Sequence, residues 1–156
     1  IVGLDMAVPT YYDEMDISIP MTKLGHYAAV LGITRWIPSL AESDAIKYGT
    51  LSENEKDIYR AVFYQRTATE TMVDEVKAVK DNANIVKEKG IPQVPMLLFI
   101  SNGSGGTGFT KERWRSIPKE YISGHDNASY IELDCPHYVH DYEYEAISKG
   151  IRTFIK

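Results

Sequence analysis

The residues best suited to acid–base chemistry lie near the end of the chain, in the run from Cys135 to His140. Histidine titrates near neutral pH, so His137 or His140 could take up and return a proton during a reaction. Residues 130–133 read as a strand and residues 141–156 as an amphipathic helix, so the histidines occupy the loop between them. Parallel sheets bind ligands at the carboxyl ends of their strands, which makes this loop a candidate site. The alternative is that both histidines are surface or helix-start residues.

A carboxylate follows another strand-like run at the opposite end of the sequence. Residues 1–4 form a short apolar segment. Asp5 comes directly after it, and Pro9 follows four residues further on. A carboxylate beside an imidazole can orient the ring and stabilise its charged form. The alternative is a strand-end aspartate that caps a turn.

The elements that would position these residues alternate between strand and helix. Residues 94–100 form a continuous apolar run, typical of a strand covered on both faces. Together with residues 1–4 and 130–133, this run predicts strand–helix–strand units, and hence a parallel sheet with right-handed crossovers. A helix near residues 111–116 should be interrupted by Pro118.

Between residues 13 and 90 the sequence favours helix. A short helix is expected over residues 40–48, and two more should start at Ser52 and Thr67, each followed by glutamate at capping-box spacing. In the second of these, apolar residues recur at steps of three and four and predict one buried stripe. The members of this stripe are Met72, Val76, Val79, Ala83 and Val86.

The end of the chain resembles the histidine end of the α/β-hydrolase fold. The likeness rests on a final strand, a loop histidine, a second histidine three residues on, an acidic residue and a closing helix. It implies that His137 is the general base, which takes a proton from a serine and later gives it to the leaving group. His140 would then help to cap the last helix.

The position of the triad acid departs from the usual pattern of that family. In most members of that family it lies in the loop after the next-to-last strand, but residues 101–108 contain no Asp or Glu. A subset that includes many haloalkane dehalogenases carries it after the sixth strand, ahead of the cap and shortly before a proline. Asp5 and Pro9 match that placement, so the resemblance implies that Asp5 is the acid. Asp126 and Asp134 are the other candidates.

The implied fold class is the C-terminal portion of an α/β-hydrolase: parallel strands flanked by helices, with a helical cap insertion. Residues 1–12 would supply a core strand and the acid loop, residues 13–90 the cap, and residues 91–156 the remaining core with the histidine loop. No GxSxG motif occurs, and the chain opens inside a strand-like run. We therefore expect an upstream segment of the same protein to supply the nucleophile, and residues 1–156 alone to be inactive.

A glycine-rich loop offers a different function. Residues 103–108 match GxGxxG after a strand, so a nucleotide- or phosphate-binding module is one alternative. Residues 111–115 are bulky and charged, which fits poorly with the helix of a dinucleotide site. A hydrolase-fold protein that binds without catalysis is the other alternative.

Composition narrows the possible partners. The net charge of −5 gives no reason to expect nucleic acid, and one cysteine excludes an internal disulfide and a multi-cysteine zinc site. The longest apolar run, residues 96–100, is too short to span a membrane. The resemblance implies an esterase-like hydrolase that acts on a small carboxylic ester or related acyl substrate. We expect it to be cytoplasmic and to need no cofactor or metal.

Overall fold

The computed structural model describes residues 1–105 and 107–156, which form two compact units. Unit 1 consists of Ile1–Met15 and Ala83–Lys156, and unit 2 consists of Asp16–Asn82. Unit 2 lies within residues 13–90, the range in which the sequence favours helix.

Unit 1 contains a three-stranded parallel sheet in the order β1-β2-β3. Its strands are β1 (Val2–Leu4), β2 (Met96–Ile100) and β3 (Ala128–Glu132). In the register of the sheet, Gly3 is aligned with Leu98, which in turn is aligned with Tyr130. The prediction of a mixed α/β protein with parallel strands flanked by helices is confirmed.

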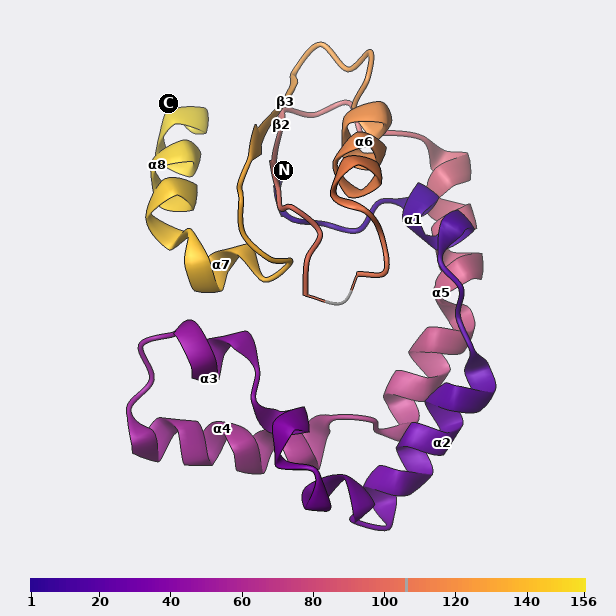
Figure 1. The fold of residues 1–156 in the computed structure, drawn as a ribbon. Helices are drawn as coiled ribbons and strands as arrows, with labels where there is room; N and C mark the ends of the chain where they lie inside the picture. The colour runs from indigo at the N-terminus through magenta and orange to yellow at the C-terminus, as the bar shows by residue number, and fades with distance from the viewer. Residues whose placement is uncertain (106) are drawn as a thin grey trace. The chain divides into compact units, whose positions relative to one another are not determined.

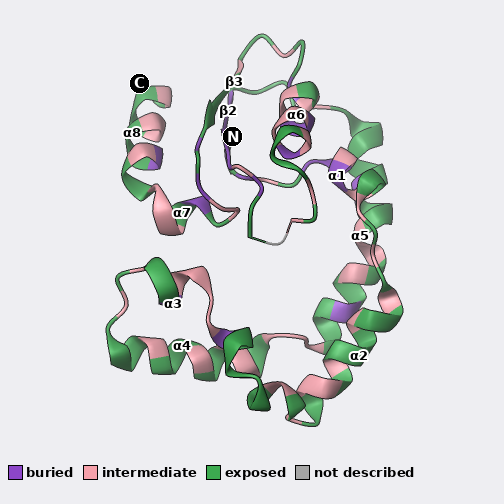
Figure 2. Cartoon of the chain, viewed as in Figure 1, coloured by how far each residue is buried: buried purple, intermediate pink, exposed green. Residues whose placement is uncertain are grey.

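The middle strand, β2, forms the core of unit 1 and is buried along its whole length (Figure 2). Met96, Leu98 and Ile100 point to one face and pack in a cluster with residues of α1 (Pro9–Glu14) and α6 (Lys111–Tyr121). Leu97 and Phe99 point to the other face, toward α7 (Val139–Tyr142) and α8 (Tyr144–Phe154). Figure 1 accordingly shows α6 and α8 on opposite sides of the strands.

Helix α8 packs directly on the sheet because Gly150 faces it. A Cβ atom at this position would lie 2.8 Å from Cζ of Phe99 and 3.1 Å from Cδ1 of Ile131. Both approaches are shorter than an ordinary van der Waals contact, so a side chain here would push α8 away from β2 and β3. The glycine therefore sets the spacing between helix and sheet.

The prediction that Pro118 interrupts helix α6 is wrong. The helix runs on to Tyr121 with Pro118 inside it, although proline has no N–H to donate to the carbonyl four residues earlier, that of Trp114. The hydroxyl of Tyr11 donates to that carbonyl instead, over 2.6 Å. Because the orphaned acceptor finds this partner from α1, the helix can continue through the proline.

The last helical segment is divided rather than continuous. The sequence predicts one helix over residues 141–156, whereas α7 ends at Tyr142 and α8 begins at Tyr144. Glu143, between them, has φ of −122° and ψ of 32°, outside the helical region. Ile147 of α8 is buried, as its place on the predicted apolar face requires.

Unit 2 is helical. It contains α2 (Ile19–Val30), two 3₁₀ turns η1 (Ile33–Trp36) and η2 (Pro38–Ala41), α3 (Asp44–Tyr48), α4 (Glu53–Arg66) and the first part of α5 (Glu70–Lys89). The predicted helix over residues 40–48 is therefore wrong in part, since η2 and α3 are separate. Among the described residues, most of the exposed large apolar side chains lie in this unit. Figure 2 shows that the helices of the unit are largely exposed or half-buried.

One of the two predicted capping boxes is confirmed. Ser52 Oγ accepts the Glu55 N–H, and the Glu55 carboxylate accepts the Ser52 N–H, at the start of α4. The box predicted at Thr67 is wrong, because Thr67 terminates α4. Thr69 takes its place: its Oγ1 accepts the N–H of Met72, the third residue of α5.

The predicted stripe on α5 is not buried as a whole. Ala83 is 8% exposed, but Met72 and Val86 are 40% and 49% exposed, and the buried residue Val73 lies outside the stripe. Helix α5 runs from unit 2 into unit 1, so no single core follows one face along its length. Among the helices that the structure describes, none has both the length and the apolar character needed to cross a membrane.

Candidate active site

Three loops meet at one edge of the sheet because its strands are parallel. Asp5 follows β1, Ser101 follows β2, and the loop that carries His137 follows β3. The N–H of Asp5 still donates to the carbonyl of Phe99, over 2.8 Å, so the acid stands where the pairing with β2 ends. This carboxyl edge is the usual location of ligands and catalytic groups in parallel sheets.

Asp5 and His137 form a hydrogen bond at this edge. Nδ1 of the imidazole lies 2.8 Å from Oδ2 of the carboxylate. The Asp5 side chain is 2% exposed, whereas that of His137 is 36% exposed. The predicted geometry, a carboxylate oxygen of Asp5 within hydrogen-bond reach of a His137 ring nitrogen, is confirmed.

The tautomer of His137 follows from its partner. An ionised carboxylate can only accept, so Nδ1 carries the proton and donates it to Asp5. Nε2 is then left with a lone pair, and it takes no hydrogen bond from the part of the chain that the structure describes. A neutral imidazole held in this way can act as a general base through Nε2.

The backbone of Asp5 adopts a conformation that few side chains tolerate. Its φ is +47°, in the left-handed region. Aspartate and asparagine enter this region more readily than other non-glycine residues, because their short polar side chains can bond locally. The backbone at this turn therefore selects the same residue type that the hydrogen bond to His137 requires.

Two residues that sequence analysis did not identify complete the surroundings of Asp5. Ser101 donates its N–H to Oδ1 over 2.7 Å and its hydroxyl hydrogen to Oδ2 over 2.6 Å. The indole N–H of Trp114 lies 3.1 Å from Oδ1 and 3.2 Å from Oδ2. The buried carboxylate thus receives donors on both oxygens, as a buried charge requires.

The other candidate acids lie elsewhere. The side chain of Asp134 is 75% exposed and accepts from Lys111 and Asn102. Its hydrogen bond from Lys111, followed by that from Asn102, lowers the pKa of this carboxyl below its usual range. Asp126 is exposed and precedes β3. Of the three candidates, Asp5 is the one bonded to His137.

His140 does not belong to the hydrogen-bonded pair of Asp5 and His137, which we call the dyad. Its predicted role as a cap of the last helix is wrong. It lies within α7, its side chain is 58% exposed, and its Nε2 is 3.6 Å from Oδ1 of Asp141. Helix α8 begins after Glu143 with no side-chain cap. Because His140 lies inside α7 and Glu143 occupies the N-cap position of α8, His140 does not cap that helix.

The glycine-rich loop holds the histidine loop. The N–H of His137 donates to the carbonyl of Ser104 over 3.1 Å, and the N–H of Asn102 donates to the carbonyl of Cys135 over 3.0 Å. Two amides of the loop already have partners: Gly103 donates to Ser101 Oγ, and Ser104 donates to Asn102 Oδ1. These amides are not available to cradle a phosphate. The glycine-rich range of residues 103–108 includes Gly106, which lies outside the described residues.

Arg115 joins the ends of the two longer strands beneath the site. Its guanidinium donates to the carbonyls of Ser101 and Leu133, over 3.1 and 2.7 Å, and pairs with Glu132 over 2.9 Å. The side chain is 16% exposed. The sequence gives no signal for this role beyond a charged residue on a helix, because the contacts are all long-range.

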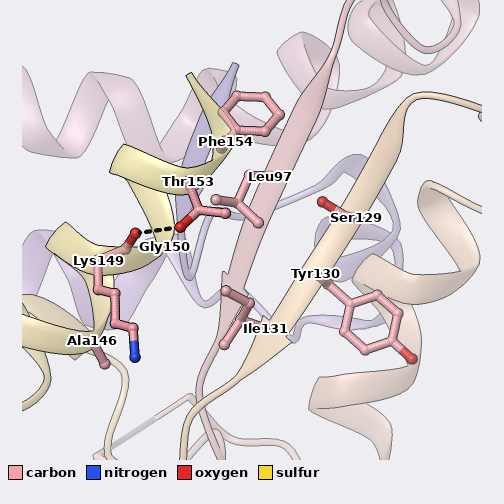
Figure 3. Close-up of a pocket in the computed structure, with 9 residues that line it drawn as sticks. All are labelled: Leu97, Ser129, Tyr130, Ile131, Ala146, Lys149, Gly150, Thr153 and Phe154. Carbon is pink, nitrogen blue, oxygen red and sulfur yellow. Dashed lines mark hydrogen bonds between the residues drawn. The ribbon is translucent and has the colours of Figure 1, made fainter. Parts of the chain in front are cut away.

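A separate apolar pocket of about 450 Å³ lies between β3 and α8 (Figure 3). Leu97, Ile131 and Phe154 line it, with Lys149 as its one charged side chain among the residues drawn. Neither Asp5 nor His137 contributes to it, so it is not the pocket of the dyad. Within residues 1–105 and 107–156, no three His, Cys, Asp or Glu side chains come together in a way that could hold a metal ion.

Comparison with protein-family models, with curated proteins and with solved structures finds no match to this chain. A functional assignment therefore depends on the geometry of the site itself.

Proposed function

We propose that this chain carries the acid and the base of a serine-type hydrolase with an α/β-hydrolase fold, acting on carboxylic ester or related acyl substrates. The observation that carries the proposal is the hydrogen bond between Asp5 Oδ2 and His137 Nδ1. His137 is the general base, Asp5 orients it, and a segment of the same protein upstream of Ile1 supplies the nucleophilic serine.

The dyad has the properties that acyl transfer needs from these two groups. Nε2 of His137 accepts the hydroxyl proton as the serine attacks the acyl carbon, and returns it to the leaving alcohol. Asp5, buried and fixed, stabilises the imidazolium that forms between these two proton transfers. The second half of the cycle repeats the sequence with water in place of serine.

The order of elements supports the hydrolase fold. Acid, glycine-rich loop and histidine follow three adjacent parallel strands in sequence order, with helices on both faces. The edge strand β1 exposes Val2 and Leu4, at 38% and 42%, while β2 is buried throughout. A further parallel strand from the nucleophile-bearing segment would pair with β1 and cover these two side chains.

Labelling with a fluorophosphonate, which reacts with activated serines, tests the proposal. The protein that joins residues 1–156 to their upstream segment should be labelled on a serine of that segment. Residues 1–156 expressed alone should not be labelled. His137→Ala should abolish the labelling and His140→Ala should preserve it.

Two results would contradict the proposal. Labelling that persists in His137→Ala would show that another group activates the serine. A folded, unlabelled full-length protein would favour a binding protein without catalytic activity.

A further inference from the structure

We propose that Ser101 and Trp114 are positioning residues that hold the Asp5 carboxylate in the orientation needed by His137. The proposal rests on the proposed function, since it assigns these residues to the acid of the same dyad. Neither residue donates a hydrogen bond to the imidazole, so their donors act on it through Asp5. The ring of Trp114 also meets that of His137 edge-on, with centroids 5.5 Å apart, and Trp114→Phe keeps an aromatic ring at that position while it removes the donor.

The pattern of donors fixes the plane of the carboxylate. Ser101 reaches different oxygens with its two donors, the N–H on Oδ1 and the hydroxyl on Oδ2. The indole N–H of Trp114 bridges both oxygens from another direction. A rotation of the carboxylate would break at least one of these bonds, so Oδ2 stays directed at His137.

The hydroxyl of Ser101 has a defined hydrogen-bond role. It accepts the N–H of Gly103 over 2.9 Å, so its single hydrogen is free to go to Asp5. Ser101 is fully buried, and its carbonyl accepts from Arg115. Arg115 thus fixes the backbone of Ser101, and Gly103 fixes its side chain.

Trp114 is held by two contacts. Its ring stacks on Tyr11, with centroids 4.2 Å apart and planes inclined by 29°. Gly103 also lies against it: this glycine has φ of +75°, and a Cβ there would lie 2.7 Å from Cγ of Trp114. The glycine thus leaves room for the indole, which is 4% exposed, and the N–H is aimed at Asp5 before any substrate arrives.

The test uses Ser101→Ala and Trp114→Phe in the full-length protein, with two matched controls. Thr107→Val removes a hydroxyl that bonds to the carbonyl of Gly103 in the same loop, without touching Asp5. Phe109→Leu alters the aromatic cluster around Trp114 without removing a donor to Asp5. Each positioning variant should lower kcat by about 10- to 100-fold with little change in KM, as expected for a misoriented base. The controls should change kcat by less than about twofold, well below the effect of misplacing a catalytic group.

A double-mutant cycle separates positioning from general support of the fold. In an Asp5→Asn background, Ser101→Ala or Trp114→Phe should lower kcat by less than about threefold, because the acid they position is already gone. Equal factors in both backgrounds would overturn the proposal. If Asp5→Asn itself leaves kcat unchanged, the proposed function fails instead.

A readout without activity keeps the two proposals distinguishable. The downfield proton resonance of the His137 Nδ1–H···Asp5 hydrogen bond should be lost or broadened in Ser101→Ala and Trp114→Phe, and retained in Thr107→Val. Retention of an unchanged resonance in both positioning variants would overturn the assignment, whatever the reaction proves to be.

Discussion

Tyr11 donates its hydroxyl hydrogen to the carbonyl of Trp114, the acceptor that Pro118 leaves without a helical donor. This bond and the ion pair between Glu14 and Arg113 tie α1 to α6. Burial, and next the charge of Asp5, raise the pKa of the Tyr11 phenol, so that it remains protonated and able to donate. The bond between Tyr11 and Trp114 thus has two effects. It lets α6 continue through Pro118, and it helps to fix Trp114, whose indole N–H faces Asp5.

Tyr11→Phe should destabilise unit 1. The substitution removes a buried donor and leaves the Trp114 carbonyl unsatisfied, which costs about 1–3 kcal/mol. Urea unfolding followed by tryptophan fluorescence measures the change. Tyr12→Phe, the adjacent and less buried position, should shift the unfolding free energy by under about 0.5 kcal/mol. Equal effects of the two substitutions would show that the Tyr11 hydroxyl has no special role.

His137→Ala in the full-length protein should reduce kcat by several orders of magnitude, because removing the base of a triad costs about that much. His140→Ala should change kcat by less than about threefold, since its side chain is exposed and bonded to neither Asp5 nor His137. Steady-state hydrolysis of a chromogenic acyl ester gives both values. Mild and equal effects would remove His137 from the role of base.

Asp5→Asn should lower kcat by about 10⁴-fold while the protein stays folded. Asparagine tolerates the left-handed φ of this position, so the loss comes from the charge and from the tautomer that it selects. Asp134→Asn is the matched control and should retain activity, because Asp134 bonds to Lys111 and Asn102. A larger loss in Asp134→Asn than in Asp5→Asn would transfer the role of acid.

Cys135 should make the stability of unit 1 depend on pH above neutrality. Burial raises the pKa of its thiol to about 11, whereas an unfolded thiol ionises near about 8.5. The folded state therefore keeps a proton that the unfolded state releases, and the associated stability is complete below about pH 8.5 and declines as the pH rises toward about 11.

Comparison with Cys135→Ala isolates this contribution from other groups that titrate at high pH. The measured quantity is the unfolding free energy of the wild-type protein minus that of Cys135→Ala. This difference should decrease as the pH rises from about 8 to about 11, the interval between the pKa values of the thiol in the unfolded and folded states. A difference that stays constant over this range would mean that the thiol ionises equally in both states.

The sequence could predict the dyad because its signals are local. Asp5 and His137 each come after a short strand-like segment, and parallel strands bring such positions to one edge. The middle strand was recognisable because residues buried on both faces form an unbroken apolar run. The family resemblance added the roles of base and acid, which stay predictions. What the structure shows is the hydrogen bond between the two side chains.

The supporting contacts were not predictable because they join distant positions. Ser101 and Trp114 lie 96 and 109 residues from Asp5 in the sequence. Neither a serine nor a tryptophan indicates by its type that its partner is a carboxylate. The continuation of α6 through Pro118 depends on Tyr11, 103 residues away from the carbonyl it bonds. The start of α5 was misplaced by two residues because Thr67 and Thr69 both offer a capping hydroxyl, and only the backbone path decides between them.

The division of unit 1 into two stretches of sequence affects how the site can assemble during folding. The hydrogen bond between Asp5 and His137 closes a loop of 132 residues. That closure carries an entropic cost, which the pairing of β1, β2 and β3 and the burial of apolar side chains on both faces of β2 offset. Strand β1 cannot pair with β2 until Met96–Ile100 have left the ribosome, and Asp5 cannot meet His137 until the loop after β3 has followed. The hydrogen bond between Asp5 and His137 should thus form late and cooperatively, after all three strands of the sheet have been synthesised.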